Sequence, residues 1–136
     1  MALTPLTRVQ QATVLALVEA RRLDVVPADL ARATSFLRQA EELGRIDGIE
    51  SAFLYGSFAA RMLGDAGPAP HDIDVMVLGE PDVDAVYEAC ARIEAAVHRP
   101  VNPAILTPEE FAASSGFLDS VRSGPAVAVI GELPWR

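Results

Sequence analysis

The chain has 136 residues and a formal net charge of −8, and 51% of its residues are hydrophobic. This length suits one globular domain, and the composition excludes an intrinsically disordered chain. The acidic balance argues against a general nucleic-acid-binding surface, which is normally basic. Because Cys90 is the only cysteine, an intramolecular disulfide and a cysteine-based zinc site are excluded.

No apolar stretch of the sequence approaches the ~20 residues that a membrane-spanning helix needs. A short apolar run at residues 12–18 lies between Gln10–Gln11 and Arg21–Arg22. These flanks favour an amphipathic helix over a secretion signal. Together with the single cysteine, they predict a reduced, cytoplasmic protein with no membrane partner.

Charge is distributed unevenly along the chain. Residues 1–46 carry six arginines and five acids, whereas residues 47–136 carry five arginines and 14 acids. We therefore expect a helical lead-in over residues 1–46 and an acidic domain over residues 47–136. The lead-in is predicted to contain an antiparallel pair of helices, one at about residues 6–22 and one that starts after Pro27 and runs to about Gly44. Four apolar positions at helical spacing mark the second helix: Leu30, Ala33, Leu37 and Ala40.

The acidic domain alternates between short apolar runs and amphipathic segments. The apolar runs predict strands at residues 51–55, 72–78, 101–106 and 126–130. Helices are predicted at residues 57–63, 82–97, 108–112 and 115–123, and residues 64–71 are predicted to form a glycine- and proline-rich loop. This order predicts an α/β (α+β) fold in which a small mixed sheet is flanked by helices.

The helix predicted at residues 82–97 carries a stripe of apolar side chains at helical spacing. The stripe consists of Val83, Val86, Tyr87, Cys90, Ile93 and Val97. Because Cys90 lies on this stripe, we expect its thiol to pack in the core rather than to react.

The first strand of the acidic domain ends at Gly56-Ser57. A glycine there lets the backbone turn sharply, and a serine at the start of a helix can donate a hydrogen bond to a phosphate beside free N–H groups. Taken alone, this pair is more typical of an ordinary turn with a helix N-cap than of a phosphate-binding site.

A second polar motif, Asp72-Ile73-Asp74, opens the next strand. Side chains alternate along a strand, so both carboxylates are expected on one face and Ile73 on the other. Two adjacent carboxylates repel each other, and a divalent metal relieves that repulsion. A small set of oxygen ligands favours Mg²⁺, which also holds substrate phosphates. The alternative is a solvated strand edge with two acids.

The combination of the two motifs is more specific than either one. A strand ending in Gly-Ser and a strand opening with Asp-x-Asp place a phosphate-binding turn beside a metal-binding pair. Such a site can bind a nucleoside triphosphate and neutralise its charge while a nucleophile attacks the α-phosphorus.

With these motifs, residues 53–79 resemble the minimal nucleotidyltransferases (MNT type) of the polymerase-beta superfamily, which occur with HEPN proteins in toxin–antitoxin pairs. The family pattern of Gly-Ser, a spacer and Asp-x-Asp is matched by Gly56-Ser57 and Asp72-x-Asp74. The resemblance continues weakly through residues 101–111 and the last strand. Here 14 residues separate Ser57 from Asp72; this spacer is longer than usual, and the excess lies in a loop where an insertion costs little.

The resemblance implies transfer of AMP from Mg·ATP to a hydroxyl of a protein or RNA partner, with a HEPN-like protein as the expected partner and this chain as the antitoxin. Asp72 and Asp74 would bind the metal and serve catalysis, with Asn102 as a weak auxiliary. Gly56, Ser57 and Arg61 would bind the phosphates. Nucleic acid is expected only as an RNA acceptor, and a second copy of the chain is a further candidate partner.

One departure from the family pattern bears on activity. Many active members place a third carboxylate on the next strand, and the matching residue here is Asn102. An amide oxygen can bind Mg²⁺ but cannot accept a proton at neutral pH. The sequence therefore leaves open slow chemistry, a base from a partner, or no chemistry. The last case would make the chain a degenerate binding or antitoxin module; a DNA-binding regulator with a helix-turn-helix at residues 6–44 is the remaining alternative.

Overall fold

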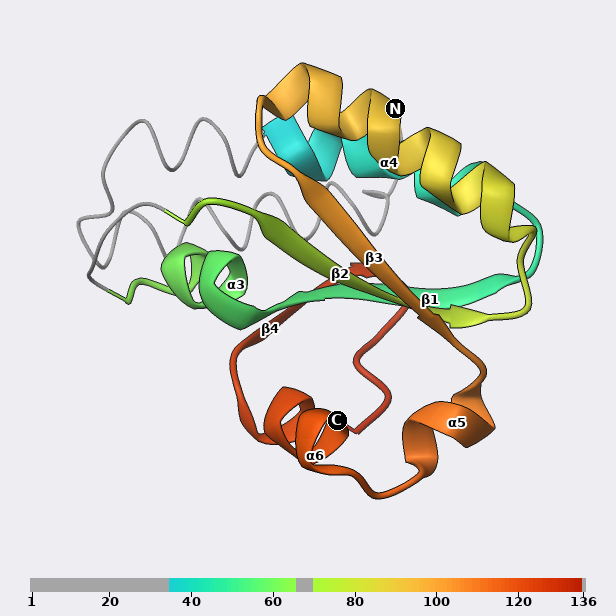
Figure 1. The fold of residues 1–136 in the computed structure, drawn as a ribbon, viewed down its shortest axis with the longest axis vertical. Helices are drawn as coiled ribbons and strands as arrows, with labels where there is room; N and C mark the ends of the chain where they lie inside the picture. The colour runs from blue at the N-terminus through green and yellow to red at the C-terminus, as the bar shows by residue number, and fades with distance from the viewer. Residues whose placement is uncertain (1–34, 66–69, 136) are drawn as a thin grey trace, which may run out of the picture.

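The computed structural model describes residues 35–65 and 70–135, which form a four-stranded mixed sheet with helices on both faces (Figure 1). The strands are β1 (Ile49–Tyr55), β2 (Ile73–Gly79), β3 (Val101–Leu106) and β4 (Ala126–Ile130), and their order in the sheet is β3-β2-β1-β4. β1 is antiparallel to both β2 and β4, whereas β2 and β3 are parallel. The predicted fold class, a small mixed sheet flanked by helices, is confirmed.

The helices fall where the sequence pattern predicted them in the acidic domain. Residues 35–39 are α-helical and continue into the 3₁₀ helix η1 (Ala40–Arg45). The others are α3 (Gly56–Met62), α4 (Val83–Val97), α5 (Pro108–Ala112) and α6 (Gly116–Ser123). α4 connects the parallel strands β2 and β3, as a parallel pair requires. The helix predicted at residues 6–22 lies outside the described residues.

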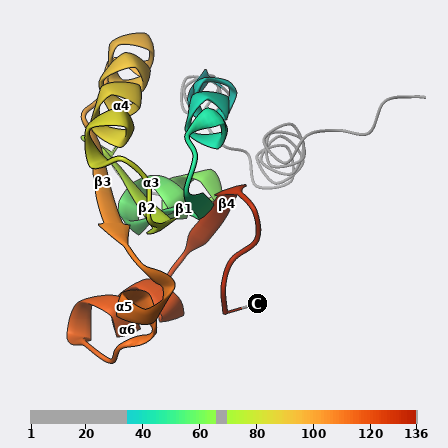
Figure 2. The ribbon, with the colours of Figure 1, turned by 90° about the vertical axis from the view of Figure 1, so that its right-hand side faces the viewer.

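The two faces of the sheet are covered by different helices. Figure 2 shows α4 and the helical segment at residues 35–45 on one side of the sheet, and α5 and α6 on the other. Side chains of β1 alternate between these layers: Leu54 packs in the core under α4, whereas Phe53 packs in the core under α5 and α6. No helix among the described residues is both long enough and apolar enough to cross a lipid bilayer.

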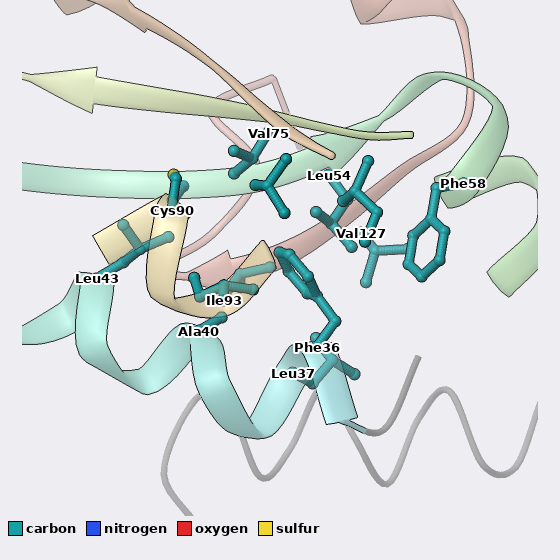
Figure 3. Packing of buried hydrophobic residues seen from close by; sticks show 14 of the residues in the cluster. Phe36, Leu37, Ala40, Leu43, Leu54, Phe58, Val75, Cys90, Ile93 and Val127 are labelled. Carbon is teal, nitrogen blue, oxygen red and sulfur yellow. The ribbon is translucent and has the colours of Figure 1, made fainter. Parts of the chain in front are cut away.

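The larger core joins residues 35–45 to the sheet (Figure 3). Phe36, Leu37, Ala40 and Leu43 are fully buried, and two of them belong to the apolar stripe predicted for the lead-in. The ring of Phe36 lies 6.1 Å from that of Phe58 in α3. Residues 36–43 therefore share one core with the acidic domain, while the predicted division into a lead-in over residues 1–46 and a domain over residues 47–136 stays a prediction.

The apolar stripe predicted for α4 is wrong at two positions. Val83 and Tyr87 are 50% and 54% exposed, and Ala89 is buried in their place. The helix contacts the sheet through Val86, Ala89 and later positions spaced three or four residues apart, so its N-terminal flank projects into solvent. Cys90 is buried as expected, and burial, with a smaller effect of Glu94, raises the pKa of its thiol to about 11.

The smaller core, under α5 and α6, is rich in aromatic rings. The rings of Phe53 and Trp135 are 5.0 Å apart in an edge arrangement, and Phe53 also contacts Phe111 at 5.8 Å. The capping box of α5, in which Thr107 and Glu110 exchange hydrogen bonds, fixes the start of the helix that carries Phe111. This layer holds α5 and α6 against the sheet face on which the polar motifs lie.

Candidate functional site

Most of the predicted site residues lie where β1, β2 and β3 run side by side. Asp74 of β2 is directly opposite Tyr55 of β1 and Asn102 of β3. Residues opposite each other on neighbouring strands project from the same face of a sheet. That face is the one under α5 and α6. Phe53, two residues before Tyr55, and Met76, two residues after Asp74, both pack in the core under these helices.

The two carboxylates of the Asp-x-Asp motif converge on one amide group. The Nδ2 atom of Asn102 donates a hydrogen bond to Oδ2 of Asp72 at 3.0 Å and makes a longer contact with Oδ1 of Asp74 at 3.5 Å. Asp72 precedes β2 rather than opening it, but the N–H of Ile73 donates to the carbonyl of Pro100 at 2.8 Å and aligns this segment with β3. Both acids therefore face the same side, as the alternation of the strand predicted.

The site holds two negative charges, those of Asp72 and Asp74, and both side chains are partly buried. Burial raises the pKa of Asp74, the neighbouring charge of Asp72 raises it further, and the hydrogen bond from Asn102 opposes the change. Burial, followed by the charges of Asp74 and Asp72, raises the pKa of the Tyr55 hydroxyl to about 12. A cation bound between these carboxylates would be stabilised by the same charges.

Gly56 places the start of α3 against the carboxylate of Asp74. Its φ of +74° lies in the left-handed region. A Cβ atom at this position would be 2.9 Å from Oδ2 of Asp74, so the absence of a side chain lets the carboxylate approach the turn. Ser57 follows in the first turn of α3 and is exposed. The Gly-Ser motif and the acid pair are thus adjacent in space.

Arg61 lies at the other end of α3 from Gly56. Its guanidinium donates a hydrogen bond to the carbonyl of Asp65 at 3.0 Å, beyond the C-terminus of the helix. Its role as a phosphate contact stays a prediction. His71, next to the acid pair, is exposed.

The donor set suits Mg²⁺ better than a metal that needs an enclosed site. Within residues 35–65 and 70–135, no group of three or more His, Cys, Asp and Glu side chains is placed to hold a metal ion. Asp72 and Asp74 offer carboxylate oxygens, and a turn of the Asn102 amide would add a carbonyl oxygen. Mg²⁺ is commonly bound by one or two carboxylates, with waters and substrate phosphates as its other ligands. The residues present therefore fit Mg²⁺ bound together with a phosphate substrate.

Phe117 is the residue near this site that sequence reasoning missed. Its ring centroid lies 5.8 Å from that of Tyr55 in an edge arrangement, and its side chain is 53% exposed. The helical spacing of the sequence could have identified it. Leu118 and Val121 lie on one face of α6 and are buried, so Phe117, which lies off that face, is a large apolar residue expected at the surface.

A family model described as the nucleotidyltransferase domain matches residues 36–123, well over half of the chain. The chain belongs to the nucleotidyltransferase domain family. The matched span of this nucleotidyltransferase domain begins at Phe36, the first of the described residues that belongs to the larger core, and ends with α6. It includes the Gly-Ser turn, the Asp-x-Asp motif and Asn102. A search of curated proteins gives no match.

Two solved structures show more distant similarity to this nucleotidyltransferase domain. One is a tri-AMPylated HEPN toxin in complex with an MNT antitoxin from Shewanella oneidensis, at 16% identity and a TM-score of 0.46, covering 74% of this chain and 73% of the other. The second comes from Sulfolobus solfataricus and carries a provisional nucleotidyltransferase assignment, at 16% identity and a TM-score of 0.37, covering 93% and 90%. The family assignment rests on the match over residues 36–123.

Proposed function

We propose that this nucleotidyltransferase domain transfers AMP from Mg·ATP to a hydroxyl group of a protein partner or, as the alternative acceptor, of an RNA. The hydroxyl oxygen bonds to the α-phosphorus, and pyrophosphate leaves. The observation that carries the proposal is the convergence of Asp72 and Asp74 on Asn102 beside the turn at Gly56. This arrangement offers oxygen ligands for a divalent metal next to the exposed start of a helix.

In this proposal each residue near the turn has a distinct role. Asp72 and Asp74 would hold Mg²⁺, which when bound neutralises charge on the phosphates. The backbone at Gly56 and the hydroxyl of Ser57 would donate hydrogen bonds to phosphate oxygens. Arg61, whose Nη1 donates to the carbonyl of Asp65, would bind a phosphate oxygen through its other N–H groups.

Asn102 limits the rate of the proposed reaction. It occupies the strand position opposite Asp74, where many family members carry a third carboxylate. Its amide cannot take a proton from the acceptor hydroxyl. The proton must therefore pass to solvent or to a base brought by the acceptor, and we propose a slow transfer that the correct partner accelerates.

The partner we propose is a HEPN-like protein, with this chain acting as the antitoxin in the cytoplasm. Support comes from the Gly56-Ser57 and Asp72-x-Asp74 motifs, which resemble those of the MNT type. Modification of a toxin hydroxyl needs no basic groove for a nucleic-acid template, in agreement with a formal net charge of −8.

A second candidate function is a catalytically degenerate binding module. The specific observation in its favour is the amide of Asn102, which donates to both carboxylates and partly offsets their repulsion without a metal. In this case the acidic surface would bind a basic partner and nucleotide would not be used.

The two functions are separated by incubating the full chain with labelled ATP, Mg²⁺ and the protein encoded by the neighbouring gene. Adenylyl transfer predicts label on the partner that is lost in Asp74→Ala and kept in Asp47→Ala, a control in an exposed turn. Equal labelling by the wild type and Asp74→Ala would rule out the proposed mechanism. Calorimetry with Mg·ATP then tests the binding module, which predicts no heat up to millimolar nucleotide.

A further inference from the structure

Phe117 is an exposed aromatic ring beside the proposed site. Four large hydrophobic side chains are markedly exposed among the described residues: Leu63, Val83, Tyr87 and Phe117. Val83 and Tyr87 lie on α4, which covers the other face of the sheet. Phe117 lies in the first turn of α6, on the face that carries the acid pair.

Tyr55 connects Phe117 to the acid pair. The two rings meet edge to face, with centroids 5.8 Å apart and an interplanar angle of 76°. Tyr55 lies directly opposite Asp74 in the sheet, so its side chain projects from the same face as that of Asp74. The ring of Phe117, the phenol of Tyr55 and the carboxylates of the acid pair therefore lie next to one another on this face of the sheet.

Phe117 is held in place by the packing of the other residues of α6, since its own side chain is half exposed. Leu118 and Val121 are buried and hold α6 to the sheet, and the hydroxyl of Ser115 accepts a hydrogen bond from the N–H of Leu118 at 3.0 Å. Arg122 of the same helix lies over the ring of Phe111, 5.3 Å from its centroid. With α6 held in this way, the ring of Phe117 is presented to solvent next to Tyr55, and the space beside Gly116 is open.

We propose that Phe117, supported by Tyr55, forms the surface on which the base of the bound nucleotide stacks. The inference rests on the proposed function, because it is the acid pair that would hold the phosphates of the same nucleotide. One aromatic ring separates the acid pair from Phe117, and the ribose and α-phosphate of a nucleotide bridge a gap of this kind. Stacking on an aromatic ring tolerates every base, since each base has a π face. The site would therefore accept different nucleoside triphosphates.

The test compares two probes, Mg·ATP and Mg·tripolyphosphate, which differ in the nucleoside. Both are titrated by calorimetry into the full-length wild type, Phe117→Ala and Tyr87→Ala. Tyr87→Ala is the matched control, because Tyr87 is exposed to the same extent but lies on the other face of the sheet. We expect Phe117→Ala to bind Mg·ATP about five- to 150-fold more weakly, the loss typical of one stacked base, and to bind Mg·tripolyphosphate as the wild type does. Phe117→Trp should keep the affinity for Mg·ATP, and Tyr87→Ala should change neither probe.

Three results would overturn the inference. Wild-type affinity of Phe117→Ala for Mg·ATP would place the base elsewhere and leave the proposed function intact. A parallel loss of Mg·tripolyphosphate binding would mean that Phe117 acts through the fold rather than on the base. Failure of the wild type to bind either probe would remove the proposed function, and the stacking role with it.

Discussion

Asn102 lies directly opposite Asp74 in the parallel pairing of β2 and β3, and its amide nitrogen reaches the carboxylates of both Asp74 and Asp72. An amide in this position joins two like charges that would otherwise repel. The same strand position would let a carboxylate join them as a third metal ligand. We therefore expect the identity of this one residue to decide between a stable metal-free site and tight metal binding.

The first prediction concerns Asn102→Asp. The change replaces a hydrogen-bond donor with a third negative charge about 3 Å from Asp72, so the metal-free protein should lose about 1–3 kcal/mol of stability. Mg²⁺ should restore more stability to the variant than to the wild type, because binding to the folded state stabilises it by mass action. Thermal unfolding in EDTA and at increasing MgCl₂ measures both effects.

Asn102→Ala serves as the control for charge. It removes the same hydrogen bonds but adds no carboxylate, so its melting temperature should respond to MgCl₂ no more than that of the wild type. If Asn102→Asp and Asn102→Ala respond equally to Mg²⁺, Asn102 does not lie at a metal-binding position.

The second prediction is that Asp74→Asn stabilises the protein at neutral pH. The pKa of Asp74 is raised in the folded state, so the folded protein holds this proton more tightly than the unfolded chain. The resulting stabilisation is complete below the unfolded pKa of about 3.9 and is lost as the pH rises through the folded pKa. Asp74→Asn should therefore be more stable than the wild type at pH 7, by an amount that solvent screening keeps small, and should gain little near pH 3.

Urea unfolding across this pH range checks the prediction for Asp74. Asp47→Asn, in an exposed turn, should leave the free energy of unfolding almost unchanged at every pH. A pH-independent difference between the wild type and Asp74→Asn would show that the substitution acts through packing rather than through charge.

The third prediction compares two glycines at helix starts. Gly56→Ala should cost more than the ~1–2 kcal/mol of an ordinary left-handed residue, because the new Cβ would lie 2.9 Å from Oδ2 of Asp74 and displace the carboxylate. Gly116→Ala meets no atom within 4 Å and should stabilise α6 by about 0.5–1 kcal/mol. Urea unfolding measures both effects, and equal effects of the two substitutions would contradict the close approach at Gly56.

Local patterns in the sequence were enough to place the strands and helices of the acidic domain, because apolar periodicity, glycines and capping residues such as Thr107 act over a few residues. The side shared by Asp72 and Asp74 also follows from local alternation. The exposure of Val83 and Tyr87 did not follow, since it depends on the angle at which α4 crosses the sheet. Nor did the contact between Tyr55 and Phe117, which depends on how residues far apart in the sequence pack together.

The last prediction concerns the thiol of Cys90, whose pKa is raised to about 11 by burial and, to a smaller extent, by Glu94. At pH 8 the folded protein should therefore react with a thiol reagent many-fold more slowly than the urea-unfolded chain, in which the pKa is about 8.5. The folded state keeps the proton that the unfolded state loses between about pH 8.5 and 11, so stability should fall as the pH rises through this window. Cys90→Ala should show a smaller fall over the same window. Rapid, stoichiometric labelling of the folded protein at pH 8 would contradict the packing of Cys90 between α4 and the sheet.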